Sequence, residues 1–155
     1  MDGGMEGMLS GRDKLLKDVF AYDMRDDKST LDGASVGEVR RIFYQWAQSV
    51  AGDSTMPKYR LCIMVDKEVL DSVMQDAYSR DDDGSCQYVK LINGEHVEHR
   101  PEEDEDEWEA VDSCTAWGLG WMRQSFRNLF PSAYRVLMNR SWDVEYCRPP
   151  KVRED

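Results

Sequence analysis

Residues 59–99 constrain the fold more than any other part of this sequence. The segment opens with an apolar run, residues 59–65, that is long enough for one buried strand and too short to cross a membrane. Asp66 follows at once as a suitable N-cap, and apolar residues then recur at helical spacing up to Ala77. The pattern therefore predicts a buried strand that runs directly into an amphipathic helix.

The second half of this segment predicts a β-hairpin. After a polar break, residues 87–92 read Gln-Tyr-Val-Lys-Leu-Ile, a composition typical of strands. Asn93-Gly94 comes next and favours a type I′ turn, because both central residues of that turn need a positive φ. Strand, helix and hairpin are thus the best-specified part of the fold, although they specify no chemistry.

Helices are predicted on both sides of this segment. Residues 12–24 carry an amphipathic pattern, and residues 23–33 form a polar loop that ends in Asp32-Gly33. Ser35 and Glu38 match a capping box, which starts a helix that runs to about Val50.

The remainder of the chain predicts two further helices and one strand. Residues 122–129 are compatible with a short helix, and Pro131 suits the start of another that continues to Arg140. Residues 142–146 alternate like an edge strand. The predicted fold class is α+β: a single domain in which a small sheet with a β-hairpin packs against N- and C-terminal helices. Its expected extent is 12–150, with a flexible leader at 1–11, an acidic loop at 100–109 and a tail at 151–155.

Charge restricts the partners that such a domain can bind. The net charge is −11, and residues 95–110 hold nine acidic residues against the single base Arg100. Because an acidic surface repels phosphate backbones, direct nucleic-acid binding is disfavoured and a basic protein partner fits better. No apolar run reaches membrane-span length, and the N-terminus lacks the pattern of a secretory signal. The four cysteines form no Cys-x-x-Cys pair. Because no secretory signal is recognised, reduced thiols and an intracellular location, cytoplasmic or nuclear, are expected.

The sequence predicts no metal or cofactor site. An EF-hand loop with its glycine at Gly84 would need an aspartate at Ser79 and a glutamate at Lys90. The Asp81–Gly84 run is therefore interpreted as a polar turn. His96 and His99, flanked by Cys86 and Cys114, would point to opposite faces of the predicted hairpin strand.

The sequence also contains little that supports catalysis, and it favours a protein without catalytic activity. No nucleophile elbow and no phosphate-binding glycine loop is present. Asp66 is the one acid that stands out, because sites in folds that combine helices with strands often lie where a strand ends. A helix cap is the simpler interpretation of the same residue.

The acidic run and its tryptophans support an interaction hypothesis. The candidate interaction residues are Glu105, Asp106, Glu107, Trp108, Trp117 and Trp121. Charge would speed the encounter with a basic partner, and a tryptophan could anchor the contact. The alternative is a solvated loop that folds back onto Arg123 and Arg127, which would share a helix face. A group of aromatic residues is interpreted as part of the hydrophobic core and not as a cage for a ligand: Trp117, Trp121, Phe126, Phe130, Tyr134 and Trp142.

Several short motifs in the second half of the chain carry a resemblance. The motifs are the strand that runs into Val65-Asp66, the following hairpin strand, Gly120-Trp121-Met122, and the closing Trp142-Asp143 with Arg148-Pro149-Pro150. In these motifs the chain resembles small intracellular proteins of filamentous fungi without an assigned function. The resemblance covers about the last hundred residues and implies no catalytic residues.

Three functions remain open at this point. The first is an intracellular, non-catalytic protein that acts through protein contacts, with a homo-oligomer as one form of such contact. The second is a small enzyme or small-molecule-binding protein with a pocket of tryptophans and carboxylates. The third is an acidic chaperone or nucleic-acid mimic that binds a basic partner.

Overall fold

The computed structural model describes residues 22–78, 87–97 and 108–154. The chain divides into two compact units, Met1–Asp32 and Gly33–Asp155. In the first unit, the predicted helix 12–24 lies outside the described residues except for its last three, which are not helical. The four-residue helix α2 (Lys28–Leu31) follows them and is capped by the Asp27 side chain. The leader 1–11 also lies outside the described residues.

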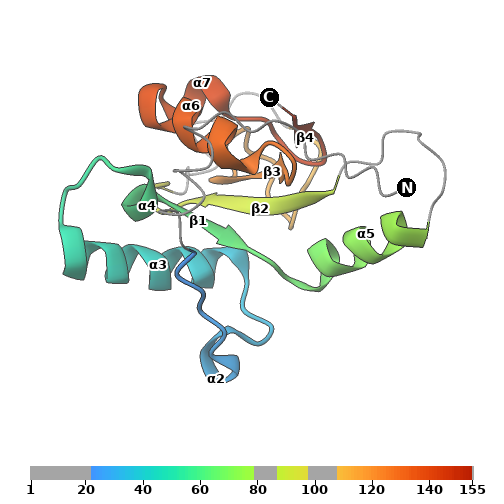
Figure 1. The fold of residues 1–155 in the computed structure, drawn as a ribbon, viewed down its shortest axis with the longest axis horizontal. Helices are drawn as coiled ribbons and strands as arrows, with labels where there is room; N and C mark the ends of the chain where they lie inside the picture. The colour runs from blue at the N-terminus through green and yellow to red at the C-terminus, as the bar shows by residue number, and fades with distance from the viewer. Residues whose placement is uncertain (1–21, 79–86, 98–107, 155) are drawn as a thin grey trace, which may run out of the picture. The chain divides into compact units, whose positions relative to one another are not determined.

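The second unit is built on a four-stranded mixed sheet, and it is an α+β fold as predicted (Figure 1). Its strands lie in the order β1-β2-β3-β4. The pairs β1–β2 and β2–β3 are antiparallel, whereas β3 and β4 are parallel. The strand bounds are β1 (Leu61–Met64), β2 (Tyr88–Asn93), β3 (Trp121–Ser125) and β4 (Val152–Arg153).

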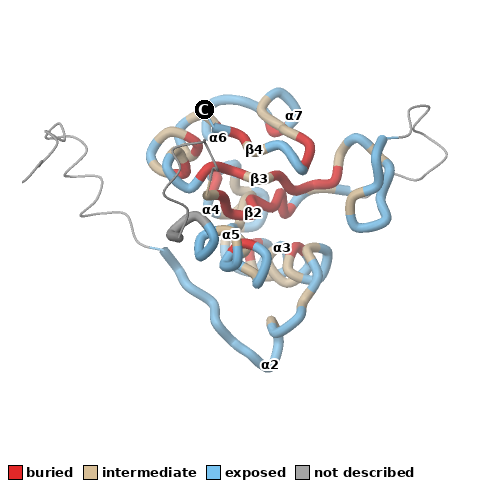
Figure 2. The backbone as a smooth tube through the Cα atoms, turned by 90° about the vertical axis from the view of Figure 1, so that its right-hand side faces the viewer, coloured by how far each residue is buried: buried red, intermediate tan, exposed pale blue. Residues whose placement is uncertain are grey.

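Helices cover both faces of this sheet. The helix bounds are α3 (Val36–Ala51), α4 (Pro57–Arg60), α5 (Lys67–Tyr78), the π-helical segment η1 (Leu129–Ala133), α6 (Tyr134–Asn139) and α7 (Trp142–Glu145). On one face, Ile92 and Trp121 pack against Val36 and Val39 of α3. On the other, Leu91 and Met122 pack with residues of α6 and α7 (Figure 1). Buried residues accordingly concentrate along β2 and β3 (Figure 2).

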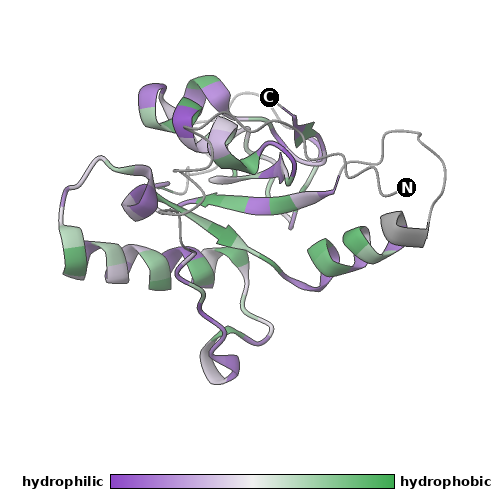
Figure 3. Ribbon diagram, viewed as in Figure 1, coloured by the Kyte–Doolittle hydropathy of each residue, from purple (hydrophilic) through white to green (hydrophobic). Residues whose placement is uncertain are grey.

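The two long helices form as predicted because their signals are local. The Ser35 hydroxyl accepts from the Glu38 amide, and the Glu38 carboxylate accepts from the Ser35 amide, so the capping box is complete. At the start of α5, Asp66 Oδ1 accepts from the Val69 amide at 3.0 Å, which confirms the predicted N-cap. Apolar and polar residues alternate along both helices (Figure 3), as expected of amphipathic segments.

The predicted hairpin at Asn93-Gly94 is wrong. Neither residue has a positive φ. The chain leaves the sheet here because β2 is already paired on both edges, with β1 and with β3. The turn with two positive φ values lies instead at Asp112 and Ser113, between the bridged residues Val111 and Cys114.

Three other local predictions fail for reasons of tertiary structure. Residues 59–65 are predicted to form a buried strand, but β1 lies at the sheet edge and Ile63 and Val65 are exposed. The first half of the predicted helix 122–129 belongs to strand β3, whose residues are mostly buried between helices on both faces. The predicted edge strand 142–146 is mostly helix α7, and the outer strand beside β3 is β4.

Candidate functional site

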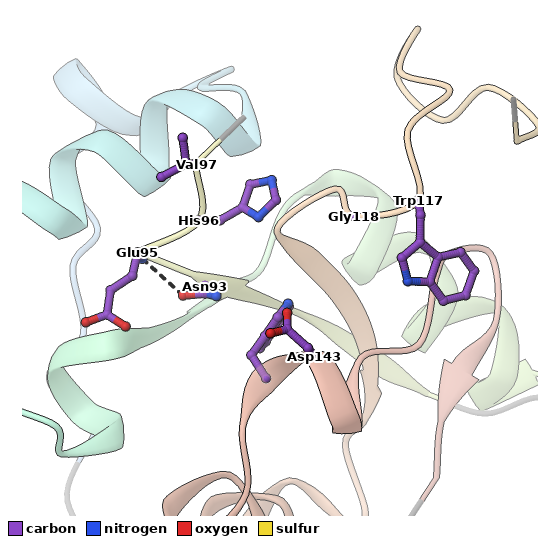
Figure 4. Close-up of a pocket in the computed structure, with 8 residues that line it drawn as sticks. Asn93, Glu95, His96, Val97, Trp117, Gly118 and Asp143 are labelled. Atoms are coloured by element: carbon purple, nitrogen blue, oxygen red, sulfur yellow. Dashed lines mark hydrogen bonds between the residues drawn. The ribbon is translucent and has the colours of Figure 1, made fainter. Parts of the chain in front are cut away.

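The candidate site is a pocket of about 360 Å³ that opens beside the end of β2 (Figure 4). Three segments meet there: the loop after β2, the loop before β3, and the start of α7. The lining residues are Asn93, Glu95, His96, Val97, Trp117, Gly118, Trp142 and Asp143. In this view the loop with Glu95, His96 and Val97 faces Trp117 across the opening, and Asp143 lies between them. Two indoles, two carboxylates and an imidazole therefore share one cavity.

The loop after β2 is held by a set of short polar contacts. Asn93 Oδ1 accepts from the Glu95 amide at 3.0 Å, and the Asn93 amide donates to the Gly120 carbonyl at 2.9 Å. The Gly94 amide donates to the Arg60 carbonyl at 2.8 Å, while Arg60 Nε pairs with Glu95 Oε2 at 2.8 Å. These contacts direct the chain out of the sheet and fix one wall of the pocket.

Glycine at position 120 allows the imidazole of His96 to pack directly against the backbone. Gly120 has φ +69°, and a Cβ there would overlap the His96 ring and lie 2.6 Å from Arg40 Nη2. Buried Arg40 donates from Nη2 to the Leu119 carbonyl at 2.8 Å. The His96 ring also lies near Gly118, where the Cβ position is 3.6 Å from its Cε1 atom, so both glycines pack against this imidazole.

Four aromatic rings contact one another in succession, and we call them the aromatic chain: Trp108, Trp117, Tyr146 and Trp142. Two of them, Trp117 and Trp142, line the pocket. The ring centroids of Trp108 and Trp117 lie 4.6 Å apart. Tyr146 meets Trp117 edge-on at 5.6 Å and Trp142 at 5.8 Å. These separations are typical of stabilising aromatic pairs. Trp108 and Trp117 are 44% and 45% exposed, whereas Trp142 is only 8% exposed.

The loop that carries Trp117 is fastened to the C-terminal segment. Buried Arg148 donates to the carbonyls of Ala116 and Cys114, each at 3.2 Å. The Tyr146 hydroxyl donates to the Trp117 carbonyl at 3.0 Å and accepts from the Leu119 amide at 3.2 Å. Burial raises the pKa of Tyr146, so this hydroxyl stays protonated and keeps its role as a donor.

The predicted interaction residues are not all placed together. Trp108 and Trp117 are in contact and exposed. Trp121 is 5% exposed and buried against α3, with the Lys90 ammonium 5.2 Å from its ring, so it does not reach the surface. Glu105, Asp106 and Glu107 lie outside the described residues, as does most of the predicted acidic loop.

A second polar group, the α5 ion cluster, surrounds the acid that the sequence singled out. It comprises Asp66, Glu68, Tyr88, Lys90 and Arg123. Lys90 Nζ lies 2.6 Å from Asp66 and 2.7 Å from Glu68, and Arg123 pairs with Glu68 at 2.6 Å. The Tyr88 hydroxyl also donates to Glu68, at 2.7 Å. The cluster joins the first turn of α5 to β2 and β3.

The electrostatics of the α5 ion cluster do not suit proton transfer near neutral pH. Burial opposes the charge of Glu68, but hydrogen bonds from Lys90 and Tyr88 outweigh it and lower its pKa to about 2. Burial and the hydrogen bond to Glu68 raise the pKa of Tyr88 to about 12. The pKa of Lys90 is also raised, because the bonds to both carboxylates outweigh its burial. These pKa values lie far from the range that general acid–base catalysis needs.

The basic residues proposed to receive the acidic loop are placed differently from the prediction. Arg123 lies on strand β3, where it pairs with Glu68 and donates to the Pro150 carbonyl at 3.0 Å. Arg127 follows the strand and is exposed. The two residues therefore do not share a helix face.

Cysteine and metal chemistry find little support in the described residues. Cys62, Cys114 and Cys147 are free thiols. Burial raises the pKa of the Cys62 thiol to about 12, although the charge of Arg40 opposes the shift. Within residues 22–78, 87–97 and 108–154, no cluster of three or more histidines, cysteines or carboxylates could hold a metal ion. His99, Cys86 and the predicted polar turn at Asp81–Gly84 lie outside these ranges.

Sequence reasoning missed Asn93, Glu95 and Asp143 as pocket residues. The sequence pattern predicts a turn at Asn93. It predicts a strand at Asp143, where the structure has helix α7. For His96 the sequence suggests a metal ligand or an exposed strand residue, and not a pocket residue. No local signal joins positions 93–97 to 142–143, because their proximity depends on how α7 packs on the sheet.

Comparisons with known proteins add no further constraint. No protein-family model matches the sequence, and no match was found among curated proteins or among solved structures. Along the described parts of the chain, no helix has both the length and the apolar character that a bilayer span requires.

Proposed function

We propose that this protein is a non-catalytic, intracellular binding module that recognises a basic segment of a protein partner. The observation that carries the proposal is the exposed pair Trp108–Trp117 beside the pocket. Tryptophan is enriched among residues that dominate binding energy, because it offers a large apolar area at a low entropy cost. Free thiols at the three described cysteines are compatible with a reducing compartment, cytoplasmic or nuclear.

Charge supports a basic partner. The chain has a net charge of −11, and residues 102–107 are six consecutive acids. In the sequence these acids lie between Val97, which lines the pocket, and Trp108, which contacts the pocket residue Trp117. Negative potential there would speed encounter with a basic segment and disfavour acidic partners.

The proposal is tested by binding of a defined peptide. The probe is a fluorescein-labelled peptide of alternating arginine, lysine and serine, and an acidic peptide of equal length is the comparison. We expect the basic peptide alone to bind the full chain, and Trp108→Ala to weaken binding by about tenfold. Phe126→Ala is the matched control, because Phe126 is 57% exposed but does not line the pocket.

The outcome is decided by the difference between these variants. Equal losses in the Trp108→Ala and Phe126→Ala proteins would show that the aromatic pair has no special role. Equal binding of the basic and acidic peptides would contradict the proposed partner chemistry. Thermal unfolding of each variant confirms that the fold is retained before binding is compared.

A further inference from the structure

Resting on this proposed function, we propose that the pocket receives an arginine side chain of the partner, with Asp143 as the counter-ion and Trp117 as the stacking surface. Both residues line the cavity of about 360 Å³. That volume lies at the small end of the range for ligand sites, roughly 300–1,000 Å³, and suits a single side chain better than a large cofactor.

Asp143 is available to bind a cation. Its carboxylate is exposed and makes no hydrogen bond or ion pair with any residue that the structure describes. The other carboxylate of the pocket differs, because Glu95 is already paired with Arg60 at 2.8 Å. Asp143 is therefore the pocket residue whose charge an incoming ligand can neutralise without breaking an existing pair.

An aromatic surface in the same pocket suits a flat cation. Trp117 lines the pocket and is 45% exposed, and its contacts with Trp108 and Tyr146 hold the indole in place. A fixed ring loses little conformational freedom on binding. Indole is the strongest of the aromatic partners in cation–π contacts.

Arginine fits this combination better than lysine. A guanidinium is planar, so it can stack on an indole while its edge donates two hydrogen bonds to a carboxylate. An ammonium is a compact and strongly hydrated charge that cannot do both in this way. Asn93 also lines the pocket, although its Oδ1 already accepts from the Glu95 amide.

The test uses two small probes, N-acetyl-arginine N-methylamide and its lysine counterpart, with the full chain. Binding is followed by NMR, through the indole N–H signals of the five tryptophans. We expect the arginine probe to shift the Trp117 and Trp142 signals in a saturable way, and to bind more tightly than the lysine probe. Trp46, on α3 outside the pocket, is the internal reference.

Two substitutions localise the effect. Asp143→Asn should weaken binding of the arginine probe by about threefold or more, as expected for loss of an exposed ion pair. Trp117→Leu should weaken it by a similar factor through the lost cation–π contact. Asp53→Asn is the matched control, because Asp53 is an exposed carboxylate that does not line the pocket, and the same unit of charge is removed.

The inference and the proposed function fail in different ways. If the basic peptide binds and depends on Trp108, but neither probe shifts the Trp117 or Trp142 signals, the arginine pocket is overturned and the binding module stands. If Asp143→Asn and Asp53→Asn weaken the arginine probe equally, only overall charge matters and the pocket is again overturned. If the arginine probe binds through Asp143 while the peptide ignores Trp108, the pocket stands and the proposed function is overturned.

Discussion

Lys90 illustrates how a charge is accommodated inside this sheet. Its side chain is only 7% exposed, yet both carboxylates of the α5 ion cluster lie within 2.7 Å of its ammonium. Burying a lysine without partners would be costly, and the two carboxylates offset that cost by pairing with its ammonium. These hydrogen bonds also hold the first turn of α5 against the sheet, so Lys90 and its two carboxylate partners have a structural role.

The acid sensitivity of the fold should depend on Glu68. Its pKa is lowered from 4.5 to about 2 in the folded chain, so its stabilising contribution is complete above about pH 4.5 and is lost as the pH falls towards 2. Glu68→Gln should therefore be destabilising at pH 7, and its difference from the unmodified protein should shrink over that interval. Urea unfolding at several pH values measures this difference, with Glu154→Gln as the control for net charge. A difference that stays constant with pH would contradict the assignment.

Gly120 is required by contact as well as by conformation. A Cβ there would overlap the His96 ring, while Gly33 has a similar φ of +70° with nothing within 4 Å of its Cβ position. We expect Gly33→Ala to cost about 1 kcal/mol through backbone strain, and Gly120→Ala to cost about 1–3 kcal/mol more through overpacking. Chemical denaturation of the two variants separates these effects. Equal costs would mean that His96 moves aside freely.

At the scale of elements, predictability follows the range of the determining contacts. The helices α3 and α5 are predictable because capping and periodicity lie within each segment. Strand β3 is not, because it mixes Trp121, Arg123 and Gln124 and is buried on both faces only after α3 and α6 have packed. The same reasoning explains the candidate site: Trp108 and Trp117 can be named from the sequence, whereas Asp143 depends on the position of α7.

Strand β4 has only two residues but is firmly anchored. Arg153 donates to Gln124 Oε1 at 2.9 Å and pairs with Glu145 at 2.6 Å, and Gln124 in turn donates to the Arg153 carbonyl at 3.1 Å. Gln124 is fully buried. The pairing therefore joins β3, β4 and α7 through side chains as well as through the strand ladder.

Arg153→Ala should destabilise the fold by about 2–4 kcal/mol, because it leaves the Gln124 amide and one partner site of Glu145 unsatisfied. Lys151→Ala is the matched control: Lys151 is exposed just before the same strand, and we expect a change of less than about 0.5 kcal/mol. Denaturant unfolding of both variants provides the measurement. Similar small losses would show that β4 contributes little to stability.

For the whole molecule, the acidic run at residues 102–107 is expected to influence encounters with a partner more than the stability of the fold. The acids at residues 102–107 contribute six of the negative charges in a net charge of −11. Unlike the carboxylates of the α5 ion cluster, they belong to the segment for which the sequence pattern predicts a solvated loop. Their expected influence is a long-range field that salt screens.

Replacing these six acids by asparagine and glutamine changes the net charge from −11 to −5. We expect slower association with the basic peptide and a weaker dependence of that rate on salt, with the free energy of unfolding changed by less than about 0.5 kcal/mol. Stopped-flow fluorescence at several salt concentrations measures the rate. Light scattering on both proteins reports whether the same charges influence self-association. An unchanged association rate would remove the electrostatic part of the proposal.

The aromatic chain also has an optical consequence. Indoles whose centroids lie 4.6 Å apart, tilted by 51°, have coupled electronic transitions, so Trp108 and Trp117 form a chiral pair that contributes paired bands of opposite sign to circular dichroism. Trp108→Phe should remove those bands. A guest that rotates Trp117 would change their intensity. Circular dichroism can therefore follow changes at the candidate site in an unlabelled sample.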